Sequence, residues 1–233
     1  GTFDVTLTVS NANGTTTELK SDYISVLQIT DYDLVITEIM YNPPESGEDM
    51  LEFIEIFNNA SSAVNLGGLY FSDGIEFEFP SEMLDAGAYY LIAKDADAFF
   101  DAFGIQAIQW TDGALNNGGE LIEISDINGN IIDQVEFSDM SPWPELPDGD
   151  GPSLTFCYPG DDNNVGENWY ASVHFAGLNP EGDSLFATPG EICEFVGLSE
   201  HSQNTQLEIY PNPNQGVFSV NTGFGNLWRL EIY

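Results

Sequence analysis

The sequence predicts an all-β protein: a β-sandwich with one short helix, flanked by partial β-sandwich units. Three observations lead to this fold class. Short apolar runs recur between clusters of Gly, Pro, Asn and Asp, as expected for a sandwich of short strands. The chain of 233 residues is 42% hydrophobic and 13% aromatic, which suffices for a sizeable core. One segment, residues 94–104, departs from this pattern and has helical spacing of its apolar residues.

The N-terminal residues 1–27 predict a β-hairpin. Phe3, Val5, Leu7 and Val9 alternate with polar residues, the turn sequence "NANG" follows, and a second strand ends in "YISVL". A lone hairpin is marginally stable in water, so this one needs partners from preceding residues or from the next domain. Because the first residues already form a predicted strand, we expect the natural chain to begin earlier.

The main unit begins at Leu34 and consists of short β-rich runs. Asn128-Gly129, between two of these runs, predicts a two-residue hairpin turn. The runs are "LVITEIMYNPP", "EDMLEFIEIFNNAS", "VNLGGLYFSDG", "FEFP", "AGAYYLIAKD", "GGELIEISDINGNIIDQVEF" and "GPSLTFCYPG".

The helical segment reads "KDADAFFDAFG", with phenylalanines at positions 99, 100 and 103. Asp95 or Asp97 can cap its N-terminus and Gly104 can end it. We therefore expect one short helix that covers an end or an edge of the sandwich.

The net charge is the most unusual feature of the composition. The chain has 39 Asp and Glu residues against 3 Lys and Arg (Lys20, Lys94 and Arg229), a formal net charge of −36. Such a surface repels nucleic-acid phosphates and anionic membranes, which excludes direct nucleic-acid binding without bridging cations. It suits a salty exterior and makes divalent cations candidate partners, although a plain solvated acidic surface is the simpler explanation. The sequence contains neither an apolar run long enough to span a membrane nor a recognisable signal peptide.

The two cysteines, Cys157 and Cys193, are 36 positions apart, and no C-x-x-C pair suggests a structural zinc site. In an extracellular protein they would form one disulfide. The alternative is a pair of buried free thiols.

Residues Leu34 to Gly190 resemble a lamin tail domain, an immunoglobulin-like β-sandwich. The resembling stretches follow one another in the family's order: "LVITEIMYNPP", "EFIEIFNNASSAVNLGGLYFSDG", "FPSEMLDAGAYYLIAKD", "LNNGGELIEISDINGNIIDQVEF", "PWPELPDGDGPSLTF", "NWYAS" and "ATPGEIC". The resemblance implies a sandwich over residues 33–194. Bacterial domains of this type are binding or structural modules of secreted proteins, and no catalytic residue set is known for them.

Both flanks resemble other extracellular units. "GTFDVTLTVSNANG" and "YISV" resemble the last two strands of a polycystic-kidney-disease (PKD) type domain, here residues 1–28. After a linker at 195–206, "LEIYPNPNQGVFSV" resembles the start of the C-terminal sorting domain of the type IX secretion system, here residues 207–233 and truncated. The residues that match its motif are Tyr210, Pro211, Asn212, Pro213 and Gly216. This resemblance implies export across the outer membrane of a Gram-negative bacterium.

Recognisable catalytic motifs are absent from the sequence. It contains no G-x-S-x-G elbow, no H-E-x-x-H and no phosphate-binding loop, and its two histidines are His174 and His201. Cys157 and His174 could pair as nucleophile and base, but a disulfide better accounts for Cys157.

Three glutamates in apolar runs are candidates for acid–base chemistry: Glu38, Glu52 and Glu55. A two-residue period places Glu38 on one strand face with Ile36 and Met40, and Glu55 on a face with Phe53 and Phe57. A carboxylate among such neighbours can be buried with a raised pKa, as a general acid requires. Alternatively, these side chains accept hydrogen bonds from backbone amides at strand ends or point into solvent.

Loop residues supply the remaining candidate sites. The turn "PDGDGPS" offers Asp148 and Asp150 as calcium ligands, although Asp in such turns commonly binds its own backbone. A carbohydrate platform could use Trp110, Trp143, Trp169 and Tyr170, unless these side chains are buried in the sandwich. The tripeptide "DSL" resembles the short O-glycan acceptor of bacteria with type IX secretion, with Ser184 as the acceptor.

These features predict a non-catalytic extracellular module of a type IX-secreted cell-surface protein, acting in adhesion, spacing or protein–protein contact. Its expected partners are proteins of the cell surface or the secretion machinery, with glycans as further candidates, and its only candidate cofactor is calcium. The alternative is an accessory or substrate-binding domain of a secreted hydrolase whose catalytic part lies upstream.

Overall fold

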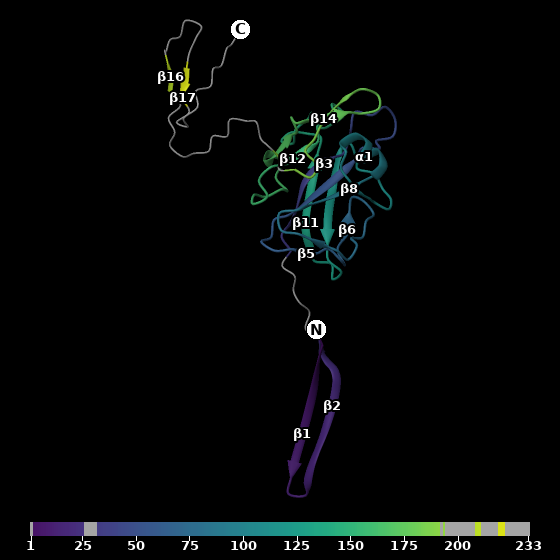
Figure 1. The fold of residues 1–233 in the computed structure, drawn as a ribbon, viewed down its shortest axis with the longest axis vertical. Coiled ribbons are helices and arrows are strands. Elements are labelled where there is room, and N and C mark those ends of the chain that lie inside the picture. Colours follow the sequence, from purple (N-terminus) through teal and green to yellow (C-terminus); the bar gives the residue numbers. More distant parts are fainter. Residues whose placement is uncertain (1, 26–31, 192, 194–207, 211–218, 222–233) are drawn as a thin grey trace. The chain divides into compact units, whose positions relative to one another are not determined.

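The computed structural model describes residues 2–25, 32–191, 193, 208–210 and 219–221. The chain divides into two compact units, Gly1–Glu194 and Phe195–Tyr233. The first unit contains the β-sandwich of residues 32–191, which Figure 1 shows between β5 and β14.

A six-stranded sheet forms one layer of the sandwich, with the strand order β13-β12-β3-β4-β8-β9. All neighbouring strands are antiparallel except β8 and β9. Its strands are β3 (Leu34–Met40), β4 (Phe53–Asn58), β8 (Tyr89–Ala93), β9 (Ile108–Gln109), β12 (Leu154–Phe156) and β13 (Trp169–Ala171).

The opposing layer is a three-stranded sheet of order β11-β10-β6. Its strands are β6 (Tyr70–Asp73), β10 (Gly119–Ser125) and β11 (Ile131–Ser138). The main core lies between the two sheets, where Ile36, Ile54 and Ile92 of the larger sheet join Ile122 and Val135 of the smaller one. Two short pairs complete the unit: β5 (Val64–Asn65) with β7 (Met83–Leu84), and β14 (Phe175–Leu178) with β15 (Ser184–Phe186). A 3₁₀ turn, Gly166–Asn168, precedes β13.

The larger sheet is also covered on its outer face. A second buried cluster there contains Met40, Phe53, Leu91, Phe99 and Leu185. Strands that are buried on both faces read as continuous apolar runs, which explains why β3 is buried over its whole length. Any carboxylate on these strands is therefore removed from water.

The predicted helix is confirmed as α1 (Ala96–Phe103). Asp95 caps it by accepting the Ala98 N–H at 2.8 Å, and Gly104 ends it in the left-handed conformation that glycine tolerates. The helix contacts β8 and β14, and Phe99 fills the outer cluster. It thus covers part of the outer face of the larger sheet.

The N-terminal hairpin is confirmed as β1 (Thr2–Asn11) and β2 (Gly14–Ser25). Its register places Phe3 opposite Ile24 and Leu7 opposite Glu18, with a bulge between Phe3 and Val5. Phe3, Leu7 and Val9 are all more than half exposed. The hairpin therefore forms by local pairing and buries little apolar surface of its own.

The turn at Asn128-Gly129 does connect two strands, β10 and β11, but it is longer than predicted. Asp126 and Asn130 close a three-residue loop through the Asp126 N–H to Asn130 C=O bond at 2.9 Å, with Gly129 at a φ of 78°. The Asp126 carboxylate accepts bonds from Asn128 and Asn130, and these bonds lower the pKa of Asp126 to about 2. Side-chain capping of the loop thus replaces the expected two-residue turn.

The second unit contributes one described strand pair, β16 (Glu208–Tyr210) with β17 (Ser219–Asn221). Tyr210 ends β16, whereas Pro211, Asn212, Pro213 and Gly216 of the sorting motif lie outside the described residues. His201 and the linker at 195–206 lie outside them as well.

Candidate functional site: a pocket over two buried glutamates

A bulge in β3 creates the most distinctive site of the sandwich. The register between β3 and β4 shifts between Ile36 and Glu38, so Thr37 and Glu38 both line the same pocket. The Ile36 N–H donates to the Asp133 carboxylate at 2.7 Å. Asn163 bridges the Ile36 carbonyl and the same carboxylate. Burial raises the pKa of Asp133 to about 6.

The bulge corrects one sequence prediction. Ile36 belongs to the main core, whereas Met40 belongs to the cluster on the outer face, so Ile36 and Glu38 do not share a face. A strict two-residue period fails here because one extra residue in β3 reverses the alternation. On β4 the period holds: Phe53 lies in the outer cluster, and Glu55 and Phe57 line the pocket.

Glu38 lies in β3 and is 1% exposed. Its Oε1 accepts the Thr188 N–H at 2.9 Å and the Ser153 hydroxyl, and its Oε2 accepts the Thr188 hydroxyl at 3.2 Å. Thr188 is 150 residues away in the sequence. The carboxylate therefore ties β3 to the turn that follows β15.

Glu55 lies directly opposite Glu38 in the register of β4 and is 2% exposed. Its Oε1 accepts the Thr37 hydroxyl at 2.7 Å and its Oε2 accepts the Gly190 N–H at 2.6 Å. Gly190 adopts a φ of 77°, a left-handed conformation that suits glycine. Both glutamates thus hold the same turn, residues 188–190, which we call the clamped turn.

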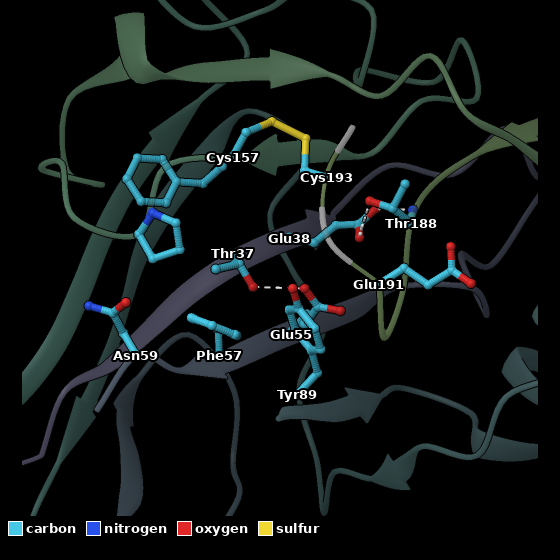
Figure 2. A pocket seen from close by; sticks show the side chains of 12 residues that line it. Thr37, Glu38, Glu55, Phe57, Asn59, Tyr89, Cys157, Thr188, Glu191 and Cys193 are labelled. Atoms are coloured by element: carbon cyan, nitrogen blue, oxygen red, sulfur yellow. Dashed lines mark hydrogen bonds between the residues drawn. A yellow bond between two sulfur atoms is a disulfide. The ribbon is translucent and has the colours of Figure 1, made fainter. Parts of the chain in front are cut away.

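The pocket above this pair has a volume of about 260 Å³. Figure 2 shows Thr37, Glu38 and Glu55 at the centre, Phe57, Tyr89 and Asn59 below them, and the Cys157–Cys193 disulfide above. The rings of Phe57 and Tyr89 lie 5.0 Å apart. Most of the lining is apolar, so the pocket has low polarity around two ionisable groups.

Burial dominates the electrostatics of the pair. It raises the pKa of Glu38 to about 7, against the bonds from Ser153 and Thr188 that favour the charged form. Burial, together with the nearby charge of Glu38, raises the pKa of Glu55 well above its ordinary value. Burial and the charges of both glutamates raise the pKa of Tyr89 to about 12. Burial therefore favours the neutral form of both carboxyls.

Glu52, the third candidate, lies at a separate place and has a different environment. It is 1% exposed, its Oε1 accepts Lys94 Nζ at 2.9 Å, and its Oε2 accepts the Leu115 N–H at 2.7 Å. Burial raises the pKa of Glu52, although Leu115 and Lys94 oppose this shift. Among the described residues, Glu52 and Lys94 form an ion pair.

The geometry of Glu38 and Glu55 is that of a structural clamp. The sequence left two alternatives open for these glutamates, and the structure combines parts of both. The two carboxyls are buried, and every carboxyl oxygen of the pair accepts a bond from the protein, including backbone N–H groups. A general acid must reach its substrate, and these side chains are almost fully covered. The sequence did not indicate Thr188 or Gly190 as partners; the only local signal was the turn-forming "TPG".

The predicted calcium ligands lie in a turn next to β3. Asp148 Oδ1 accepts the Asn42 side-chain N–H at 2.6 Å, and the Asp150 N–H donates to the Leu146 carbonyl. Within the part of the chain that the structure describes, no three His, Cys, Asp or Glu side chains are placed to hold a metal ion. Calcium binding at Asp148 and Asp150 stays a prediction.

The proposed aromatic platform does not form. Trp110, Trp143 and Trp169 are each less than 9% exposed, and Trp169 packs on Trp143 and Phe156. Indole groups with this much buried area contribute to the core, which is why they are not available to a sugar. Tyr170 is partly buried on β13.

The other predicted positions lie at the pocket and around the β14–β15 pair. Cys157 and Cys193 form a disulfide at the pocket, so Cys157 is not a free nucleophile. Ser184 is exposed at the start of β15. His174 lines a small hollow beside Phe103 and Pro189. Among the described residues, no helix is long and apolar enough to cross a membrane.

One comparison with known protein families agrees with this fold. Residues 28–139 match the family described as Lamin Tail Domain. This segment carries β3 to β11 of the sandwich, and the fold is an immunoglobulin-like β-sandwich similar to that of this family. No curated protein matches the sequence. A solved structure of a DUF4876 family protein from Bacteroides thetaiotaomicron is similar with 11% identity and a TM-score of 0.38, covering 88% of this chain and 86% of that chain.

Proposed function

We propose that this chain is a non-catalytic extracellular module that acts through protein–protein contact at the cell surface of a Gram-negative bacterium. The observation that carries the proposal is the complete internal use of the Glu38 and Glu55 oxygens. The pocket that holds the chain's best acid–base candidates serves to fasten the clamped turn. A lamin tail sandwich with this arrangement is a rigid scaffold rather than an active site.

Two features support an extracellular location. The Cys157–Cys193 disulfide fits an oxidising compartment, and the charge of −36 fits a surface exposed to salt. The resemblance of Tyr210 to Gly216 to a sorting motif supplies the export route. Type IX secretion would bring the module across the outer membrane, where adhesion or spacing would be its role.

Catalysis is tested by a substrate screen with the purified chain. Chromogenic glycosides, phosphoesters, carboxyl esters and peptides should show no turnover above buffer. The Glu55→Gln variant is the matched control, because it removes one ionisable group and keeps the size of the side chain. Turnover by the natural chain that disappears in Glu55→Gln would overturn the non-catalytic assignment.

Location is tested in the native host. Brief proteolysis of intact cells should remove the protein. The mass of the purified protein should increase by two alkyl groups when it is reduced before alkylation, and should not increase without reduction. In a strain that lacks type IX secretion the protein should resist external protease. Protection from protease in the parent strain would contradict the proposed surface location.

A further inference from the structure

The outer edge of β8 has backbone groups without a strand partner. In an antiparallel pair, residues alternate between those that bond to the neighbouring strand and those whose N–H and C=O point the other way. The Lys94 N–H to Glu52 C=O and Asn58 N–H to Ala88 C=O bonds, each 3.0 Å, set this alternation between β4 and β8. Tyr89, Leu91 and Ala93 therefore direct their backbone groups away from β4.

Strand β9 covers only part of this edge. It pairs in parallel with Ile92 and Ala93, and Ala93 C=O accepts the Trp110 N–H at 3.0 Å. The preceding residues Ile105 and Ala107 leave the sheet and pack against the outer cluster. Strand β9 therefore does not pair with the outward backbone groups of Tyr89 or with the N–H of Leu91. Among the described residues, these groups have no backbone hydrogen bond on that side.

A groove of about 650 Å³ lies along this open edge. It is lined by residues 87–91 and 105–108, together with Glu82 and Gly190 of the clamped turn. Both Leu91, which is 8% exposed, and Ile108, which is 44% exposed, line this groove. An edge with unused donors and acceptors beside apolar walls is the arrangement that accepts an added strand.

The charge of the groove and of the whole chain indicates which kind of segment can bind there. The described residues that line the groove include one carboxylate, Glu82, and no cationic side chain. The Tyr90 hydroxyl donates to Glu82 at 2.7 Å and holds this carboxylate at the groove. A second copy of the chain would bring another charge of −36 and be repelled, whereas a basic segment would be attracted.

We propose that the outer edge of β8, at Tyr89 to Leu91, binds an extended segment of a partner protein that carries lysine or arginine, by adding it as a strand to the six-stranded sheet. The segment would bond to the backbone of Tyr89 and Leu91 and place apolar side chains against Ile105 and Ile108. A basic side chain would then reach Glu82. This inference rests on the proposed role in protein contact and specifies the chemistry of the partner.

The test uses blocked synthetic peptides of about six residues, the usual length of a strand. An alternating Lys-Val peptide is the probe, a Lys-Lys-Lys-Val-Val-Val peptide controls for charge without alternation, and an alternating Glu-Val peptide controls for the sign of the charge. Amide NMR shifts and hydrogen exchange of the whole chain are recorded. The alternating Lys-Val peptide should bind best, shift residues 87–91 and 105–108, and protect the amides of Tyr89 and Leu91.

Two pairs of variants separate backbone pairing from general attraction. Tyr89→Pro removes the outward N–H, which an edge strand tolerates, and Tyr89→Ala removes the side chain but keeps the N–H. Tyr89→Pro should weaken binding about tenfold relative to Tyr89→Ala, because hydrogen bonds at the edge are lost. Glu82→Lys should weaken binding more than Glu82→Gln, and this pair decides the matter if Tyr89→Pro does not fold.

Several results would overturn the proposal. They are equal binding by the alternating and block Lys peptides, protection outside the groove, or concentration-dependent dimers formed through this edge in sedimentation. Absence of peptide binding at about 1 mM would also reject it, since even a weak docking site should then be occupied. In a chain that is still inert toward substrates and exposed on cells, such a failure would leave the proposed function standing.

Discussion

Glu52 and Glu55 are three residues apart on one segment, equally buried, and yet they are stabilised by different means. Glu52 faces the Lys94 ammonium, whereas Glu55 faces a second carboxyl, that of Glu38. The sequence supplies only Lys94 as a Lys or Arg residue between positions 32 and 193. Once Lys94 is paired with Glu52, no further lysine or arginine of the sandwich is available to the other pair.

The difference shows how a cation-poor protein buries acidic groups. An uncompensated buried charge is costly, so the group must pair, accept hydrogen bonds or remain protonated. Glu52 uses a cation and one N–H, while Glu38 and Glu55 use hydroxyls, backbone amides and a raised pKa. The second solution depends on mild changes of pH, because the pKa of Glu38 is raised to about 7.

The largest expected effect comes from removing the cation. Lys94→Met should destabilise the fold by about 3–5 kcal/mol near pH 8, because Glu52 stays buried without its partner. Urea denaturation measures the loss. The double variant Glu52→Gln/Lys94→Met should recover most of the stability, and a loss below about 1 kcal/mol for Lys94→Met would show that Leu115 alone satisfies Glu52.

The pH dependence of stability sharpens the contrast. Because the pKa of Glu38 is raised from 4.5 to about 7 in the folded protein, its proton is held more tightly there than in the unfolded chain. The raised pKa of Glu38 contributes to the free energy of unfolding in full below about pH 4.5. This contribution, roughly 3 kcal/mol, is lost as the pH rises through 7. Denaturation curves between about pH 5 and 8 should record this decline.

Glu38→Gln tests the origin of that decline. Its amide keeps an acceptor for Ser153 and Thr188 and offers a donor to the Thr188 hydroxyl, while the repulsion of Glu55 disappears. The decline of stability with rising pH should become shallower in this variant. Glu76→Gln, at an exposed position, is the control and should retain the original slope. An unchanged slope in Glu38→Gln would mean that other groups cause the dependence.

The smallest expected effect concerns one hydroxyl of the clamp. Thr188→Val keeps the N–H bond to Glu38 but removes the hydroxyl bond, at a cost of about 1 kcal/mol. Because that bond lowers the pKa of Glu38, its loss should raise the pKa further, so the destabilisation should be larger near pH 8 than near pH 5. Thr111→Val, at an exposed position, provides the matched control. Equal losses at both pH values would contradict a bond to a charged Glu38.

Local sequence patterns predicted the structural elements that are formed by local interactions. The hairpin of β1 and β2, the helix after Asp95 and the strands of the sandwich depend on alternation, capping and turn residues that lie close together in the sequence. Burial of Glu38 and Glu55 with raised pKa values was one of two alternatives that the sequence left open, since carboxyls within apolar runs can be buried with them. The bulge at Thr37 was not, because a single inserted residue leaves no periodic signal in so short a strand.

The sequence by itself determined the all-β sandwich, its helix and the scarcity of cations that leaves most buried carboxylates to hydrogen bonds. The tertiary structure alone decided which donors they receive: Thr188 and Gly190 lie 150 and 135 residues from their glutamates. It also decided which stretch of strand edge stays open, since β9 meets β8 at only two positions. Pairing over such distances is set by the packing of the whole sandwich, which no short window of sequence contains.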